Sequence, residues 1–338
     1  MKGKDINDLV ERTHILPSLS LEITNRCNFK CVHCFIENRQ STNSHQHLSL
    51  DQIRRVLKQA YNMNVFKITI TGGEPFLHPQ IIEILEEIKK YNFICYVLSN
   101  GTLINENNIS VIKKCVNKLF LSNYGFSKET YESVTNVSGT YSSYSKAITL
   151  LNQYNIPYEE RVILLRENEI ELPQFIKSDL KIETCICGDR FDNYASAHRP
   201  SDEAIKNVYH KIINTTFCKN RNSDDYVCNV GCSSMTIKAT GEVTPCNNYG
   251  VVIGHIENYT IQELWEGDIL KTIKEKTKFE NFEKCFTCSN KQYSLFLLPC
   301  NNYQETGDSN TPSLEACRHC RIIKEVVQDK EAKVRVNE

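Results

Sequence analysis

The chain has 338 residues, with 40 Lys or Arg against 41 Asp or Glu, so its formal net charge is −1. This balance argues against nucleic acid as a partner, because nucleic-acid-binding proteins usually carry a basic excess. No apolar run reaches the roughly 18 residues of a membrane span, and the N-terminus lacks the apolar core of a signal peptide, so we expect a cytoplasmic protein without a membrane partner.

Strand-like and helix-like segments alternate from residue 19 to about 190. The first strand is predicted at 21–24, and the helix that follows, at 49–63, begins with Ser49 and Gln52 at the spacing of a capping box. Further strands are predicted at 66–71, 93–99, 118–122, 158–165 and 181–187, and further helices at 78–91, 105–116, 141–155 and 171–178. Such alternation favours a parallel sheet with right-handed crossovers.

We therefore predict an α/β fold whose main part is a partial (β/α)6 TIM-like barrel, with its chemistry at the carboxyl ends of the strands. A doubly wound sheet is the alternative. After residue 200 the alternation stops, long polar loops follow, and cysteines become frequent.

Cysteine is the unusual part of the composition, with 16 residues in the chain. In a cytosolic chain of this length, so many thiols favour metal or redox chemistry over disulfides. Three of them lie in CNFKCVHC, just after the first strand, and nine follow residue 215.

The first group, Cys27, Cys31 and Cys34, holds three thiols in one tight loop. Thiolates suit zinc and iron–sulfur clusters. Structural zinc takes four ligands, and the only nearby fourth candidate, His33, would have to fold back to reach it. Three thiolates on a cubane of four irons would instead leave one iron open for a small chelating molecule.

The spacing Cys-x3-Cys-x2-Cys resembles the motif of the radical S-adenosylmethionine (radical SAM) enzymes. The resemblance implies that the open iron chelates the amino and carboxylate groups of S-adenosylmethionine. It also implies reductive cleavage of the sulfonium to methionine and a 5′-deoxyadenosyl radical that abstracts hydrogen from a substrate. In such enzymes the cofactor supplies the difficult chemistry, and the protein supplies binding and orientation.

Three further motifs lie at strand ends where that family has them. TGGEP at 71–75 resembles the Gly-Gly-Glu-Pro motif that contacts the methionyl amine, SNG at 99–101 resembles Thr/Ser-Asn-Gly, and LSNYG at 121–125 holds a serine where relatives place one near the methionyl carboxylate. A glycine-rich turn is the plain alternative for the first motif. The resemblance implies cofactor-binding roles for Gly72, Gly73, Glu74, Pro75, Ser99, Asn100 and Ser122.

Two positions depart from the family pattern. His33 stands where the family often has an aromatic residue near the adenine, although its ring can also stack. Relatives often carry an arginine about a dozen residues after Ser122, but SVTNVSG holds none. Arg161 on the fifth strand is the candidate replacement as a cofactor ligand; the alternative is that it pairs with a nearby acid.

The later cysteines resemble the SPASM domain, including Gly241 ahead of a cysteine and a hydrophobic linker up to Trp265. The resemblance implies two auxiliary 4Fe–4S clusters, although the later spacings are longer than usual, and leaves Cys218 spare. Cys228, Cys232, Cys246 and Cys317 would hold the first cluster, and Cys285, Cys288, Cys300 and Cys320 the second, with Cys317 and Cys320 interchangeable. The alternative is a zinc-ribbon-like pairing of Cys285/Cys288 with Cys317/Cys320.

These motifs divide the chain into four parts. We expect an N-terminal extension (1–18), a radical SAM core (19–205), a SPASM auxiliary iron–sulfur domain (215–325) and a polar tail (326–338).

The resemblance implies a peptide or protein substrate, because SPASM enzymes mostly modify these. We expect oxidative maturation of a ribosomally made peptide, such as cross-linking, with an external flavodoxin- or ferredoxin-type electron donor. With only about 18 residues before the first strand, leader recognition would need a separate leader-peptide-binding protein or the barrel itself. The alternatives are a peptide epimerase, a sulfatase-maturase-like enzyme and an aminosugar dehydrogenase, and more remotely a non-enzymatic zinc or electron-transfer protein.

Cys185 and Cys187 end the sixth predicted strand, facing the expected substrate mouth. One of them would be the catalytic hydrogen-atom donor of an epimerase; otherwise both pack as small hydrophobic side chains, as we expect for Cys95 and Cys115. Glu160 is either a substrate-side base or an exposed strand-end carboxylate.

Overall fold

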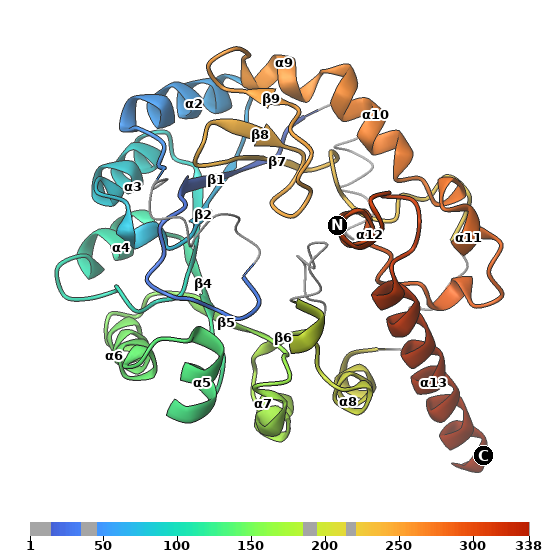
Figure 1. Ribbon diagram of the computed structural model, residues 1–338. Coiled ribbons are helices and arrows are strands. Elements are labelled where there is room, and N and C mark those ends of the chain that lie inside the picture. The colour runs from blue at the N-terminus through green and yellow to red at the C-terminus, as the bar shows by residue number, and fades with distance from the viewer. Residues whose placement is uncertain (1–14, 35–45, 185–194, 214–220, 338) are drawn as a thin grey trace. The chain divides into compact units, whose positions relative to one another are not determined.

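The computed structural model describes residues 15–34, 46–184, 195–213 and 221–337 (Figure 1). The chain forms two compact units. The first comprises Met1–Asn123, Ser127–Arg161 and Asn229–Ile273, and the second comprises Tyr124–Phe126, Val162–Cys228 and Lys274–Glu338.

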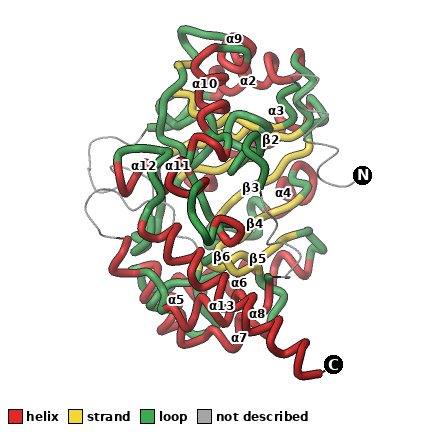
Figure 2. Tube along the Cα trace, turned by 90° about the vertical axis from the view of Figure 1, so that its right-hand side faces the viewer, coloured by secondary structure: helices red, strands yellow, loops and turns green. Residues whose placement is uncertain are grey.

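The first unit is built on a sheet in the order β5-β4-β3-β2-β1-β7-β8-β9. Its strands are β1 (Ser18–Thr24), β2 (Lys67–Gly72), β3 (Ile94–Ser99), β4 (Lys118–Ser122), β5 (Tyr158–Ile163), β7 (Ser234–Ile237), β8 (Glu242–Thr244) and β9 (Gly254–His255). Strands β1 to β5 and β7 pair in parallel, and β8 and β9 are antiparallel. Figure 2 shows β2, β3 and β4 following one another across this sheet.

Helices α2 (Leu50–Asn62), α3 (Ile81–Lys90), α4 (Ile109–Cys115), α5 (Lys128–Thr135) and α6 (Thr140–Gln153) lie along one side of that sheet (Figure 1). The predicted capping box is present, with Ser49 and Gln52 bonding each other's backbone. Alternate strand residues such as Leu19, Leu21 and Ile68 are fully buried, as expected for the sheet face that helices cover. The short helix α9 (Ile261–Trp265) contacts α2.

The parallel α/β sheet confirms the predicted fold class. Strands β1 to β5 are added in one direction, without the reversal of strand order that defines a doubly wound sheet. This order is that of a barrel wall, and it excludes the doubly wound alternative.

The second unit contains β6 (Lys181–Glu183) and the helices α7 (Leu172–Lys177), α8 (Asp202–Ile212), α11 (Glu283–Phe286), α12 (Pro299–Thr306) and α13 (Leu314–Asn337). The β6 strand lies beside the chain that follows β5, because the Leu164 amide donates to the Glu183 carbonyl at 2.8 Å. A core of buried residues from α7, α8 and α13 includes Phe175, Val208 and Ile323. Helix α10 (Asp268–Lys276) crosses from one unit to the other.

The segment interpreted as a polar tail begins inside α13, which continues to Asn337. Val326 and Val327 are buried in the core of the second unit. With Ile322 and Ile323 one turn earlier they form an apolar stripe of helical period, so the polar-tail interpretation was wrong for the start of this segment. Apart from Tyr124–Phe126, the units divide at residues 161/162, 228/229 and 273/274, whereas the predicted boundary near 205–215 stays a prediction.

Among the described residues, no helix is both long enough and apolar enough to cross a membrane.

Candidate functional site

The three-cysteine loop follows β1 and is fixed by the end of α5. The amide of Lys30 donates to the Thr135 carbonyl at 2.9 Å, and the amide of Val32 donates to the Val134 carbonyl at 3.0 Å. Cys31 therefore lies between two backbone hydrogen bonds, which restrict where its thiol can point.

Two buried apolar side chains of the same loop anchor it to the first unit. Phe29 and Val32 are buried, and the ring of Phe29 meets that of Tyr131 edge-on at 6.4 Å between centroids. Because these two apolar side chains are buried, the short loop is held in place while its three thiols stay partly exposed.

Cys27, Cys31 and Cys34 are partly exposed, and none is in a disulfide. The Cys27 sulfur accepts a hydrogen bond from the Phe29 amide at 3.4 Å and from Asn100 Nδ2 at 4.0 Å. N–H groups directed at sulfur suit a thiolate ligand. Three thiols on one anchored loop thus fit, by their chemistry, an iron–sulfur cluster with one open iron. His33 is buried beside them.

No set of three or more Cys, His, Asp or Glu side chains in the described part of the chain has the spacing of a closed metal site. The fit of Cys27, Cys31 and Cys34 to an iron–sulfur cluster therefore rests on their thiol donors and on the hydrogen bonds that fix the loop.

The two glycines after β2 are required by the chain's own backbone. Gly72 has a φ of +136°, and a Cβ there would lie 2.3 Å from the Thr24 carbonyl oxygen. A Cβ on Gly73 would lie 2.0 Å from the carbonyl oxygen of Arg26. Both glycines thus allow the end of β2 to lie close to the start of the cysteine loop, while their predicted role in binding the cofactor stays a prediction.

Glu74 is fully buried and joins the ends of β2 and β3. Its carboxylate accepts hydrogen bonds from Ser99 Oγ and the Asn100 amide, both at 2.8 Å, and from the Phe76 amide at 3.1 Å. Pro75 is buried at the start of the 3-10 turn Pro75–Leu77. The structure therefore brings these predicted cofactor-binding residues together, hydrogen-bonded to one another.

Two residues of this network, Asn28 and Thr102, were not predicted from the sequence. Asn100 Nδ2 donates to Asn28 Oδ1 at 2.8 Å, and Asn28 Nδ2 donates to Thr102 Oγ1 at 2.9 Å. In the sequence, the indication of this contact was the polar residue Asn28, which directly follows the first cysteine. Together these bonds connect the cysteine loop to the end of β3.

Ser122 and Arg161 lie opposite each other in the β4–β5 pairing. Arg161 Nε donates to Glu159 Oε1 at 3.0 Å, and its guanidinium lies 4.2 Å from the Phe120 ring centroid. The structure thus shows the acid pairing that was the alternative for Arg161, while the register keeps it beside Ser122.

Glu160 is held on the helix side of β5. Tyr144 Oη donates to it at 2.6 Å and Asn123 Nδ2 at 2.9 Å. Burial, and next the Glu160 carboxylate, raise the pKa of Tyr144. Its half-buried carboxylate thus serves as an acceptor for two neighbours, so the prediction of an exposed strand-end carboxylate was wrong, while a role as a base stays a prediction.

Cys95 and Cys115 are buried, as expected of core residues. Burial raises the pKa of Cys95 to about 12 and raises that of Cys115 as well. Cys185, Cys187 and Cys218 lie outside the described residues.

In the second unit, four cysteines interact electrostatically: Cys285, Cys288, Cys317 and Cys320. Burial, and next the neighbouring Cys317, Cys288 and Cys320, raise the pKa of Cys285 to about 12. The Asn290 amide donates to Cys288 Sγ, and Cys320 Sγ donates to the Asn290 carbonyl, each at 3.4 Å.

This grouping favours the paired alternative, Cys285/Cys288 with Cys317/Cys320, while the sequence-based ligand sets stay a prediction. Cys317 and Cys320 lie three residues apart on one face of α13, and Cys317 neighbours Cys285 and Cys288. Cys300 Sγ donates to Asn301 Oδ1 at 3.7 Å. Of the remaining set, Cys228 lies in the second unit, whereas Cys232 and Cys246 lie in the first.

Two family models match this chain. Residues 21–178 match the radical SAM superfamily, and residues 228–289 match the SPASM iron-sulfur cluster-binding domain. The first match contains the cysteine loop and the ends of β2 to β4, and the second contains five of the later cysteines.

Curated relatives resemble parts of the chain. The antilisterial bacteriocin subtilosin biosynthesis protein AlbA of Bacillus subtilis is 30% identical over 156 residues, which are 45% of this chain and 34% of AlbA. A probable GTP 3′,8-cyclase of Thermoplasma volcanium is 27% identical over 208 residues, which are 58% of this chain and 63% of the relative. The chain thus spans less than two thirds of either relative.

A solved structure has the same fold over nearly the whole chain. Native anSMEcpe with bound AdoMet and Cp18Cys peptide superposes with a TM-score of 0.69 at 18% sequence identity, covering 95% of this chain and 99% of that one. This likeness confirms the partial barrel followed by a further domain.

The two matches confirm the predicted enzyme class and cofactors: a radical SAM domain binds a 4Fe–4S cluster and S-adenosylmethionine, and a SPASM domain binds iron–sulfur clusters. The ligand residues and the number of auxiliary clusters stay predictions. The chain therefore belongs to the radical SAM superfamily and carries a SPASM iron-sulfur cluster-binding domain after its barrel strands.

Proposed function

We propose that the protein matures a ribosomally made peptide or protein by an oxidative radical reaction. The observation that carries this proposal is the presence of a radical SAM domain and a SPASM domain in one chain. The similarity to AlbA, a bacteriocin biosynthesis protein, supports it, as does a fold shared with anSMEcpe, whose structure holds AdoMet and a peptide.

In this proposal Cys27, Cys31 and Cys34 hold the cluster to which S-adenosylmethionine binds. When bound, this pair of cofactors supplies hydrogen-atom abstraction. The chain itself contributes the fixed loop, the Glu74 network at the ends of β2 and β3, and Ser122 beside Arg161 as polar groups for the methionyl end.

We further propose that Cys285, Cys288, Cys317 and Cys320 share one auxiliary cluster. Alanine at Cys285 or Cys317 should then remove about four irons per chain and abolish the same EPR signal in the reduced protein. The matched control is Cys95→Ala, which removes a buried thiol and should leave iron content unchanged. If C285A and C317A abolish different signals, the four thiols do not share a cluster.

The function is tested with protein reconstituted anaerobically and given dithionite and S-adenosylmethionine. We expect a synthetic peptide library with a fixed Cys or Ser to raise the yield of 5′-deoxyadenosine several-fold, and mass spectrometry to find peptides lacking two hydrogens. Such peptides would show oxidation. If no peptide raises the yield or changes mass, the proposal fails.

The similarity to a probable GTP 3′,8-cyclase favours a second candidate, a nucleotide substrate. The same assay with GTP in place of the peptides separates the two. Stimulation by GTP alone would favour nucleotide cyclisation over peptide maturation.

A further inference from the structure

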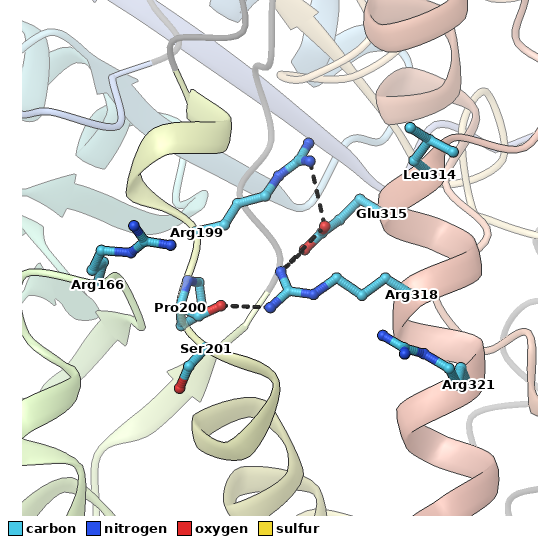
Figure 3. Close-up of a pocket in the computed structure, with 8 residues that line it drawn as sticks. All are labelled: Arg166, Arg199, Pro200, Ser201, Leu314, Glu315, Arg318 and Arg321. Atoms are coloured by element: carbon cyan, nitrogen blue, oxygen red, sulfur yellow. Dashed lines mark hydrogen bonds and ion pairs between the residues drawn. The ribbon is translucent and has the colours of Figure 1, made fainter.

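Four arginines of the second unit line one cavity of about 380 Å³ (Figure 3). Arg166 follows β5, Arg199 precedes α8, and Arg318 and Arg321 lie three residues apart on α13. The other lining residues are Pro200, Ser201, Leu314 and Glu315. So many guanidinium groups around one cavity make it a site for an anion.

Two of these arginines are held in place by hydrogen bonds. Arg318 donates from Nε to Asp202 Oδ1 and from Nη2 to the Pro200 carbonyl, both at 2.6 Å. Its Nη1 lies 3.2 Å from Glu315, whose other oxygen lies 3.4 Å from Arg199 Nη1 (Figure 3). The cavity wall is therefore pre-organised, so that little ordering entropy is lost when a ligand binds.

Three of the four arginines pair with carboxylates. Asp202 also pairs with Arg321 at 2.7 Å, and Glu305 pairs with Arg199 at 3.4 Å. Arg166 makes no ion pair with any residue that the structure describes. Its guanidinium is therefore the one in this cavity that is available to a carboxylate of a ligand.

Apolar surface adjoins the charged cavity. A second cavity of about 690 Å³ shares Arg166 and Ser201 with the first. Its lining includes the apolar residues Ile170, Leu172 and Ile176 and the charged residues Glu169, Lys177 and Glu203. Ile170 is 79% exposed, and Leu314 in the first cavity is 81% exposed. Large apolar side chains exposed beside a polar rim are typical of interaction sites.

We propose that the two joined cavities, which we call the arginine groove, bind a peptide segment in which one Asp or Glu is flanked by apolar residues. The carboxylate would lie against Arg166 in the first cavity, and an apolar neighbour would lie against Ile170 in the second. This inference rests on the proposed function, because the segment would belong to the peptide substrate. A nucleotide fits less well, since among the described residues no aromatic ring lines either cavity for base stacking.

The test measures binding without turnover. An array of synthetic decapeptides, each with one Glu between Leu or Ile residues, is probed with the labelled holoprotein alongside matched peptides that carry Gln instead. We expect binding to a subset of the Glu peptides, at least about tenfold weaker binding of the Gln partners, and loss of binding in Arg166→Glu. Arg166→Lys should recover part of the affinity, and Ile170→Ser should weaken it.

Lys58→Gln, which removes one exposed charge from α2, is the control and should bind like the wild type. Equal binding of Glu and Gln peptides, no binding of any Glu peptide, or peptide binding insensitive to Arg166→Glu would overturn the proposal. Displacement of bound peptide by GTP in an Arg166-dependent way would overturn it in favour of a nucleotide. If peptides bind the groove but no peptide of the Cys or Ser library raises the yield of 5′-deoxyadenosine or changes mass, the proposed function is refuted and the groove remains.

Discussion

Cys31→Ala is expected to reduce the yield of 5′-deoxyadenosine at least about a thousandfold, which corresponds to about 4 kcal/mol of activation free energy. Cys31 is the central cysteine of the loop and lies between two backbone hydrogen bonds to the end of α5. Neither neighbouring thiol can take its place, since the Lys30 and Val32 amides keep the loop fixed. The yield is measured by chromatography after anaerobic reconstitution with dithionite and S-adenosylmethionine.

The matched control for this variant is Cys95→Ala. Cys95 is fully buried in β3, where its thiol is part of the hydrophobic core. We expect this control to retain most of the wild-type yield. Cys31→Ala should also lose about four irons per chain while keeping the auxiliary signal. Wild-type yield from Cys31→Ala would refute the assignment of the cysteine loop.

The barrel strands were predictable because buried parallel strands and amphipathic helices alternate with clear periods. Helix α5 was missed because its sequence, KETYESVT, offers only two large apolar residues, Tyr131 and Val134, and no long apolar stripe. Tertiary contacts stabilise it, since Tyr131 packs against Phe29 of the cysteine loop and Tyr144 of α6.

The position of the cysteine loop was also predictable, because it follows a strand whose end defines one rim of the sheet. The partners of the side chains there were not. Glu74 meets Ser99 and Asn100 across 25 or more residues of sequence, and local pattern contains no information on such a bond. The neighbours of Cys317 were not predictable for the same reason, because the spacing of cysteines along the chain does not determine which other thiols lie near α13.

Glu74→Ala is expected to lower the free energy of unfolding by about 3 to 5 kcal/mol, because it leaves three buried or half-buried donors without their acceptor. These are the hydroxyl of Ser99 and the amides of Asn100 and Phe76. Glu74→Gln should lower the free energy of unfolding roughly half as much. Its carboxamide oxygen can still accept hydrogen bonds, whereas its NH2 group cannot accept one from the donor that it faces. Urea denaturation of the three proteins, followed by circular dichroism, measures the difference.

The control is Glu83→Ala, which removes an exposed carboxylate from α3 and should change stability by less than about 0.5 kcal/mol. Because the Glu74 bonds connect the end of β2 to β3, and Asn100 in turn contacts Asn28 and Cys27, loss of Glu74 should also loosen the cysteine loop. We therefore expect Glu74→Ala to bind S-adenosylmethionine more weakly even where it remains folded. A Glu74→Ala protein as stable as the control would show that the buried carboxylate is not what joins the strand ends.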